Sequence, residues 1–218
     1  MAHPAFPGYP REAGTPRTAG DPTYQLLQRM LDLGCHLLPL RPGEKRAAGS
    51  GWPNAAPLGV EEARAHLDSG RNLGVNLGRS GMVCVDSENA LATAALLEAG
   101  FIPTVIPAKA QLTAADIDFA VHGHKQGGAH FWMLVPPGID PLELHKTTVI
   151  PLPGGGVVDA LAGKGAYAVA PPSRIIEAQR YTYAPAQGGP LDLSLTNPPR
   201  LQVAPAWLFE ATVEGVAA

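Results

Sequence analysis

The chain has 218 residues, of which 45% are hydrophobic and 16% are charged. This length fits one domain or two fused lobes with a shared core, and the apolar content excludes disorder over the whole chain. The net charge of −3 spreads 16 Lys and Arg among 19 Asp and Glu with no basic block, which excludes a protein that holds nucleic acid by charge alone. Any nucleic acid would have to be held weakly, through bound metal, or with help from elsewhere.

The sequence predicts neither a membrane span nor a secretion signal. No run approaches the ~18 consecutive apolar residues that a spanning helix requires, and the first 21 residues contain no apolar segment. The two cysteines, Cys35 and Cys84, form no C-x-x-C pair, which argues for a reducing compartment and against a Cys-rich zinc site. We expect a cytoplasmic protein with no membrane partner.

The N-terminal part predicts an arm, a helix, a strand and a long loop. Residues 1–20 are rich in Pro, Gly and Ala, which is typical of a flexible arm. Asp21-Pro22 indicates a helix start and Gly34 its end. Residues 35–40 predict a short buried strand. Residues 41–59, which include Lys45, form a loop of a length that usually has a function.

The rest of the chain mixes helices and strands in irregular order. Residues 72–78 and 82–88 are expected to be strands joined by a tight turn, and 180–185 a possible edge strand. Further helices are expected at 60–69, 90–99 (capped by Asn89), 113–121 and 204–213, and further strands at 129–135, 156–163 and 166–173. With no fixed-period repeat, this order predicts an α/β or α+β fold with a mixed sheet.

Paired acids follow the apolar run that ends at Val85. Residues two apart on a strand point to the same face, so Asp86 and Glu88 are expected side by side. Such a pair costs electrostatic energy unless it is solvated, protonated or bridged by a cation, and Mg²⁺ or Mn²⁺ prefers these oxygen ligands. The alternative is a solvated turn after a buried strand.

A third acid, Asp159, lies among apolar residues in a predicted strand. Buried charges need a partner or a metal, although this Asp could also cap a bulge or pair with Lys164. Three carboxylates on two adjacent strands would suit a two-metal site for phosphoryl transfer.

His130 follows the glycine pair Gly127-Gly128. Glycines allow close approach of a phosphate to the backbone, and a histidine there can donate to a phosphate oxygen. The alternative is a packed strand histidine. His122 and His124 would share a strand face and could bind a metal, but we favour a polar loop near the phosphates. The sequence contains no Walker A loop, G-x-S-x-G elbow or dinucleotide fingerprint.

In order and spacing these motifs resemble the bifunctional DNA primase/polymerase (prim-pol) domains of the archaeo-eukaryotic primase superfamily, which occur in plasmid and phage replication proteins. The resemblance runs from about Leu26 to Tyr183. It covers four pieces in the family's order: LLPLRPGEKR with GW, NLGVNLGRSGMVCVDSE, GGAHFWMLVPPG, and VVDALAGKGAYAVAPPS with the trailing RYTY.

The resemblance implies a role for each matched position. Asp86, Glu88 and Asp159 would bind the catalytic metals, Mg²⁺ or Mn²⁺. His130, with Gly128 two residues before it, would contact the incoming triphosphate. The implied fold is a two-lobed α/β structure with an RNA-recognition-like catalytic sheet, spanning residues 21–218.

The chain departs from the family pattern at its basic residues. The basic residue expected shortly before the glycine pair is displaced by the stretch 106–126, so Lys125 and Lys109 are its candidate replacements. The Arg expected soon after the third acid is absent, and Lys164 can stand in for it. We include Lys45, Lys125 and Lys164 among the nucleotide-binding candidates. Some members of the family carry a zinc-binding insertion, and with only two isolated cysteines we do not expect one in this chain.

The first hypothesis is therefore a metal-dependent nucleotidyltransferase that makes and extends primers. It would act on NTP and dNTP with a single-stranded DNA template or primer, as the N-terminal piece of a longer replicase with a fused or associated helicase, in a bacterial or phage-infected cytoplasm. A non-catalytic nucleotide- or nucleic-acid-binding module is the second hypothesis, and a metal-dependent phosphoesterase or nuclease the third.

Overall fold

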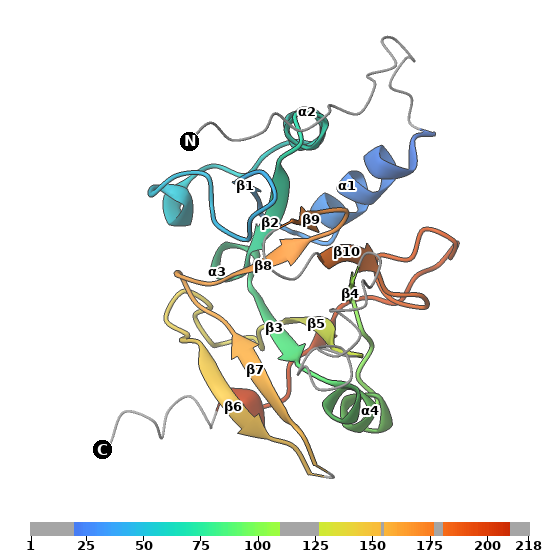
Figure 1. Cartoon of the computed structure of the whole chain (residues 1–218). Coiled ribbons are helices and arrows are strands. Elements are labelled where there is room, and N and C mark those ends of the chain that lie inside the picture. Colours follow the sequence, from blue (N-terminus) through green and yellow to red (C-terminus); the bar gives the residue numbers. More distant parts are fainter. Residues whose placement is uncertain (1–19, 110–126, 154, 177–180, 210–218) are drawn as a thin grey trace, which may run out of the picture.

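Two β-sheets of unequal size form the framework of the molecule (Figure 1). The computed structural model describes residues 20–109, 127–153, 155–176 and 181–209. The small sheet has the strand order β1-β2-β8, and the large sheet has the order β6-β7-β3-β5-β4-β10-β9 with β11 beside β5. All pairs are antiparallel except the parallel pair of β11 and β5. The expected α+β class and mixed sheet are confirmed.

The small sheet is covered by two helices whose starts were readable in the sequence. Helix α1 (Pro22–Asp32) begins at Asp21, whose side chain accepts a hydrogen bond from the Thr23 N–H at 2.7 Å. Arg64, in the middle of α2 (Val60–Asp68), donates to the same Asp21 carboxylate, which ties the start of α1 to α2. Strand β1 (Leu37–Leu40) follows α1, and the long loop after it contains the short 3-10 helix η1 (Trp52–Asn54).

The connection between β2 (Asn72–Asn76) and β3 (Met82–Ser87) differs from the expected tight turn. The chain forms a one-turn helix, α3 (Leu77–Ser80), because the Asn76 side chain accepts from the Arg79 N–H and Gly81 ends the turn at φ 65°. The two strands lie in different sheets, so the expectation of a simple two-strand turn is wrong. At this point the chain passes from the small sheet to the large one.

A second crossing returns the chain from β7 (Val157–Leu161) to β8 (Tyr167–Ala170). The two crossings touch at glycines, since a Cβ on Gly78 would lie 2.7 Å from the carbonyl oxygen of Gly163. The absence of a side chain at Gly78 lets the crossings pass closely. Figure 1 shows β3 running down from this junction and the antiparallel β7 running up toward it.

The large sheet contains four strands that the sequence did not predict. Strand β5 (Ala129–Leu134) and helix α4 (Ala90–Glu98) match expectation. Strand β10 (Tyr181–Pro185) lies between β4 and β9, so its assignment as an edge strand is wrong. The strands without a sequence prediction are β4 (Val105–Lys109), β6 (Thr147–Pro151), β9 (Arg174–Ile175) and β11 (Gln202–Val203).

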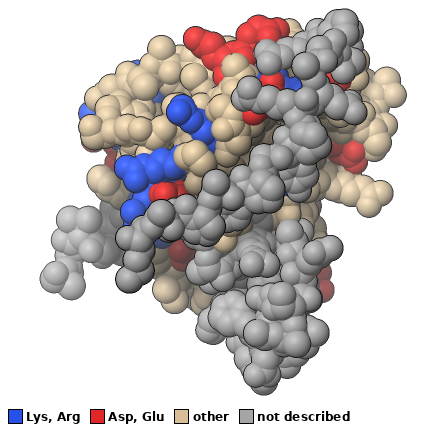
Figure 2. Space-filling model, turned by 45° about the horizontal axis from the view of Figure 1, so that its top comes forward, with Lys and Arg blue, Asp and Glu red and all other residues tan. Residues whose placement is uncertain are grey.

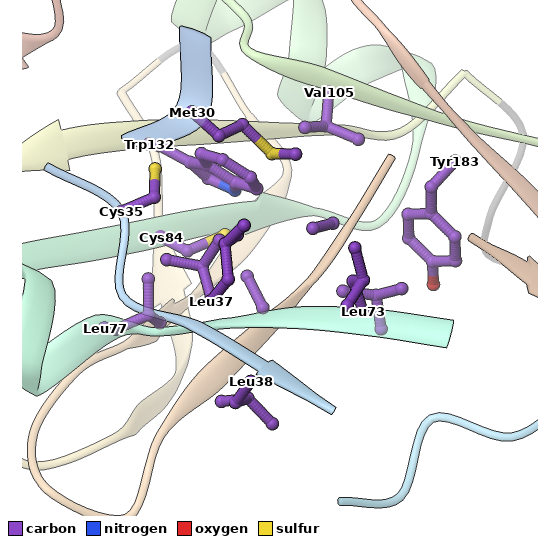
Figure 3. Close-up of a cluster of buried hydrophobic side chains, with 14 of the residues drawn as sticks. Met30, Cys35, Leu37, Leu38, Leu73, Leu77, Cys84, Val105, Trp132 and Tyr183 are labelled. Carbon is purple, nitrogen blue, oxygen red and sulfur yellow. The ribbon is translucent and has the colours of Figure 1, made fainter. Parts of the chain in front are cut away.

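Two hydrophobic clusters lie on opposite faces of the large sheet. The first joins both sheets, and Figure 3 shows Met30, Leu37, Leu73, Cys84 and Trp132, from five different elements, meeting within it. The second cluster packs the other face of the sheet against α4. The shared first cluster is the reason that the two sheets form one folded unit.

Several expectations fall on residues that the structure does not describe. These are the N-terminal arm, the helix at 113–121, the histidines and lysine at 122–125, and the C-terminal helix from residue 210 on. The described part of that last helix is helical at residues 207–209. Among the described helices, none combines the length and apolar character needed to cross a membrane.

Candidate active site

Two carboxylates and a histidine lie in one row across three neighbouring strands. Asp86 of β3 is directly opposite Asp159 of β7 on one side and His130 of β5 on the other. Directly paired residues of antiparallel strands project from the same face of a sheet. We call Asp159, Asp86 and His130 the polar row. It lies on the face that also contains Cys84 and Trp132, the face turned toward the small sheet.

The two acids differ in their protein partners. The Nε2 atom of His130 lies 3.5 Å from Oδ1 of Asp86, and both side chains are largely buried, with 7% and 16% of their surface exposed. Asp159 instead accepts a hydrogen bond from the Val149 N–H at 3.1 Å and lies 3.4 Å from Nζ of Lys146. Asp86 therefore faces His130, on the side away from Asp159. Asp159 faces Lys146 and the Val149 N–H, on the side away from Asp86.

A bulge in β6 explains how the backbone reaches Asp159. The register of β6 and β7 shifts between Thr147 and Ile150, and Val149 has a φ of 60°. Positive φ is rare for a β-branched residue. It turns the Val149 N–H toward the Asp159 carboxylate. Sequence reasoning missed Lys146 and Val149 because β6 shows no alternation of apolar and polar residues that would have revealed a strand.

A cation and an aromatic ring lie on the His130 side of the row. The rings of His130 and Tyr183 are 5.6 Å apart, and Nζ of Lys45 is 6.0 Å from the centre of the Tyr183 ring. The backbone carbonyl of Lys45 accepts a hydrogen bond from the Tyr167 hydroxyl at 2.7 Å. The long loop after β1 therefore brings Lys45, a predicted nucleotide-binding residue, to the same side as His130.

Glu88 lies just beyond the end of β3, where the chain turns into α4. The next residue, Asn89, caps α4 by accepting from the Ala92 N–H at 2.9 Å. Glu88 is half-buried and follows Asp86 by two positions. The site thus places a third carboxylate at the end of the strand that carries the central acid.

The glycine pair before β5 packs against the chain's own backbone. A Cβ on Gly128 would lie 2.3 Å from the carbonyl oxygen of Ser87, and a Cβ on Gly127 would lie 2.9 Å from Cβ of Ala90. The need for glycine at these positions is explained by the close passage of β5 beside the end of β3. The phosphate contact expected of Gly128 stays a prediction.

The remaining predicted lysines fall in different places. Lys164 lies in the crossing between β7 and β8, where it lines a cavity of about 600 Å³ together with Lys146. Lys125 is outside the described residues, as is the side chain of Lys109. Lysine and arginine side chains are scattered in the sequence, yet Figure 2 shows several of them gathered in one area of the visible face.

The donor atoms of the row suit a hard divalent cation, although their side chains are turned elsewhere. Within the described ranges, no three His, Cys, Asp or Glu side chains are grouped closely enough to hold a metal ion as they stand. Two neighbouring carboxylates repel each other, and here Asp86 lies against His130 while Asp159 lies against Lys146. The backbone register, which sets Asp86 opposite Asp159, provides oxygen ligands of the kind that Mg²⁺ and Mn²⁺ prefer.

The surroundings of Cys84 disfavour it as a further metal ligand. It lies two residues before Asp86 on the same face and is fully buried. Burial raises the pKa of the Cys84 thiol well above its usual value, and the nearby Asp86 carboxylate raises it further. Because the thiolate is the form that binds metal, this buried thiol is a poorer candidate ligand than the carboxylates of the polar row.

Comparison with known protein families identifies a match over most of the chain. A family model described as bifunctional DNA primase/polymerase, N-terminal, matches residues 27–207. That range includes both sheets, the polar row and the loop that carries Lys45. No match was found among curated proteins.

Proposed function

The chain belongs to the family of N-terminal domains of bifunctional DNA primase/polymerases, and from this premise we propose that it is a DNA-templated nucleotidyltransferase that makes primers and extends them. The observation that carries the proposal is the register of the polar row. Two carboxylates occupy directly paired positions, with a histidine on one side of them. Two-metal phosphoryl transfer uses oxygen ligands grouped at one place, and carboxylates on adjacent strands can supply them.

Asp86, Glu88 and Asp159 would hold the divalent ions, Mg²⁺ or Mn²⁺. Bound there, such ions lower the pKa of an attacking 3′-hydroxyl and offset charge at the α-phosphate and on the departing pyrophosphate. Asp86 lies between the other two acids, along β3 and across to β7. It is therefore the residue best placed to contribute to both ions.

His130 and Lys45 are the residues that would bind the triphosphate. His130 presents Nε2 toward Asp86 at 3.5 Å, and Asp86 orients the imidazole in this arrangement. A phosphate oxygen entering beside Asp86 can accept from the same nitrogen. Lys45 lies on the same side and supplies a cation for the outer phosphates. No covalent intermediate on the protein is needed.

The partners follow from the same chemistry. The substrates are NTP or dNTP and a single-stranded DNA template with its primer, and a fused or associated helicase would supply that template. The net charge of −3 predicts weak binding of the template by the domain alone. Bound metal ions, rather than a large basic surface, would supply the positive charge at the reacting phosphates.

A non-catalytic nucleotide-binding module is the competing candidate. It is favoured by the present contacts of the acids, since Asp86 lies against His130 and Asp159 against Lys146. A module that binds nucleotide without catalysis would bind it equally well with and without divalent ion. The polymerase proposal requires nucleotide binding that strengthens when Mg²⁺ or Mn²⁺ is added.

The decisive test is nucleotide incorporation on a single-stranded template, with and without an annealed primer, in Mg²⁺ or Mn²⁺. The Asp86→Asn variant keeps the shape of the side chain and removes its charge, so incorporation should fall by about 10³-fold or more. Asp32→Asn, in the exposed last turn of α1, is the matched control and should keep full activity. Undiminished synthesis by Asp86→Asn would refute the assignment, and release of monophosphates from DNA without incorporation would indicate a nuclease.

The role of His130 can be tested separately. His130→Gln retains a hydrogen-bond donor but cannot carry a positive charge. We expect KM for the nucleotide to rise by roughly ten-fold while the affinity for primed template stays the same. A change confined to the affinity for DNA would place His130 at the nucleic acid instead.

A further inference from the structure

A cavity of about 600 Å³ lies beside the polar row, on the side opposite to His130. Its walls come from the segment before β6, from the end of β7 with the crossing to β8, and from the first residue of β8. Leu161, which follows Asp159 by two positions on β7, and Lys146, which contacts Asp159, both line the cavity. Strand β3 lies between β7 and β5, so it separates this side of the sheet from His130. The function proposed above leaves this cavity without an occupant.

The walls combine an apolar floor with cations at the rim. Leu142, Leu144 and Leu161 supply apolar surface, while Lys146 and Lys164 are exposed and no lining residue is acidic. An apolar floor beneath paired cations fits a ligand with a flat or apolar body and an anionic group. A nucleotide of a DNA strand has this composition, with its base or sugar on the floor and its phosphate at the lysines.

One side of the cavity is connected to the loop that carries Lys45. The Tyr167 ring lines the cavity and packs edge-on against Trp52, with ring centres 4.9 Å apart. Its hydroxyl donates to the Lys45 carbonyl at 2.7 Å. The loop on the triphosphate side and the wall of the cavity are therefore fixed by the same residue, so the two subsites keep a constant spacing across the acids.

Lys146 joins the cavity to the chemistry. Its side chain lines the cavity, and its Nζ lies 3.4 Å from Oδ2 of Asp159. Along the sheet the order is therefore Lys146, Asp159, Asp86 and His130, with Lys45 beyond Tyr183 on the His130 side. Cations flank the acids on both sides, which suits two separate anionic substrates that meet at the acids.

In-line transfer decides which substrate belongs on which side. The attacking and leaving oxygens lie on opposite sides of the phosphorus. If pyrophosphate leaves toward His130 and Lys45, the attacking hydroxyl enters from the Asp159 side. The 3′-oxygen then forms a bond to the α-phosphorus, the bond from that phosphorus to the bridging oxygen breaks, and the hydroxyl proton passes to solvent.

We propose that the cavity between the segment before β6, the end of β7 and the start of β8 binds the 3′-terminal nucleotide of the primer strand. The assignment rests on the proposed polymerase function. Lys164 then contacts a backbone phosphate of the primer rather than the triphosphate. Lys146 releases Asp159 when the primer enters and contacts the terminal phosphodiester.

The test compares primed and unprimed DNA with the Lys164→Ala variant, using fluorescence anisotropy at several salt concentrations. Loss of one charged contact should weaken binding of primed template about ten-fold. The slope of log affinity against log salt should become shallower by about 0.9, the value for one duplex phosphate contact. Affinity for the unprimed template, and KM for the nucleotide, should change by less than about two-fold. Arg200→Ala removes an exposed cation outside the cavity and the polar row, and should leave all four measurements unchanged.

The possible outcomes separate this inference from the function on which it rests. An increase in KM for the nucleotide, with binding of primed DNA unchanged, would overturn the inference and return Lys164 to the triphosphate. Normal incorporation with every quantity unchanged would overturn it as well. A wild-type chain that incorporates no nucleotide, but binds primed DNA in a manner dependent on Lys164, would support the cavity as a DNA site and refute the polymerase.

Discussion

The two faces of the large sheet are built from alternate residues of the same strands, yet they differ in a way that separates stability from function. On the face that packs against α4, buried apolar side chains continue along β3, β5 and β7, with Val85, Phe131 and Val158 as examples. On the face toward the small sheet, Cys84 and Trp132 give way after two residues to Asp86 and His130.

The difference shows how alternate residues of one strand can contribute to the hydrophobic core on one face and to the candidate site on the other. Because side chains alternate between faces, Val85 can be fully buried against α4 while its neighbour Asp86 projects toward the small sheet. Even Ser87, on the α4 face, is satisfied by internal hydrogen bonds to Thr93 and to the Ala129 carbonyl. We therefore expect substitutions on one face to reduce activity and those on the other to reduce the free energy of unfolding.

The largest expected effect is on the polar face. Asp159→Asn should lower the rate of incorporation by about 10³-fold, or ~4 kcal/mol in activation free energy, because the charge of a proposed metal ligand is lost. Stability should change little, since the ion pair with half-exposed Lys146 contributes little in solvent and one charge of a like-charged pair is removed. Thermal unfolding together with primer extension checks both parts. Normal primer extension by Asp159→Asn would show that the polar face does not have the catalytic role expected of it.

The largest stability effect is expected on the α4 face. Phe131 is fully buried there, so Phe131→Ala should reduce the free energy of unfolding by about 4 kcal/mol through lost burial and a cavity. Urea denaturation measures this change. Activity per folded molecule should remain near that of the unchanged chain at low temperature. A variant that is stable but inactive would show that the face has a direct role.

A smaller effect is expected where the strands approach most closely. Gly128→Ala would place a Cβ 2.3 Å from the Ser87 carbonyl oxygen, so β5 must move relative to β3. We expect a loss of about 1–3 kcal/mol in the free energy of unfolding. Because the movement also displaces His130 from Asp86, KM for the nucleotide should rise. Unchanged unfolding with a raised KM would instead favour direct contact of Gly128 with a phosphate.

The smallest effect is expected far from both faces, at the start of α1. Burial alone would raise the pKa of Asp21, but hydrogen bonds from Arg64 and the Thr23 N–H lower it below the usual 3.8. A lowered pKa means that the folded chain releases this proton more readily. The stabilisation is therefore present above about pH 3.8 and is lost as the pH falls through the folded value.

Asp21→Ala should accordingly cost about 1 kcal/mol at pH 7, the usual value for an N-cap. The difference between the two chains should shrink as the pH is lowered toward 3. Urea denaturation across this range measures it, with Asp32→Asn as the control. A difference that does not depend on pH would show that the Asp21 charge has no part in the stability.

The sequence predicted best those elements whose signals are local. Asp21 and Asn89 mark helix starts by their own side chains, and β5 is recognisable from its apolar run. Strands β4 and β6 were missed because Pro107 and the bulge at Val149 interrupt any alternation. Lys146 was missed because it joins the site only through a tertiary contact with Asp159, which no local pattern in the sequence indicates.

The amino-acid sequence by itself determined the helix caps, the identity of the three acids and the histidine, and the family to which they belong. The tertiary structure alone decided that Asp86 lies directly between Asp159 and His130, that Lys45 and Lys146 lie on opposite sides of them, and that a cavity adjoins one side. Local signals depend on neighbours along the chain. The order of strands depends on three crossings between sheets, from β2 to β3, from β7 to β8 and from β8 to β9. The close contact of the first two at Gly78 and Gly163 joins parts of the chain far apart in sequence.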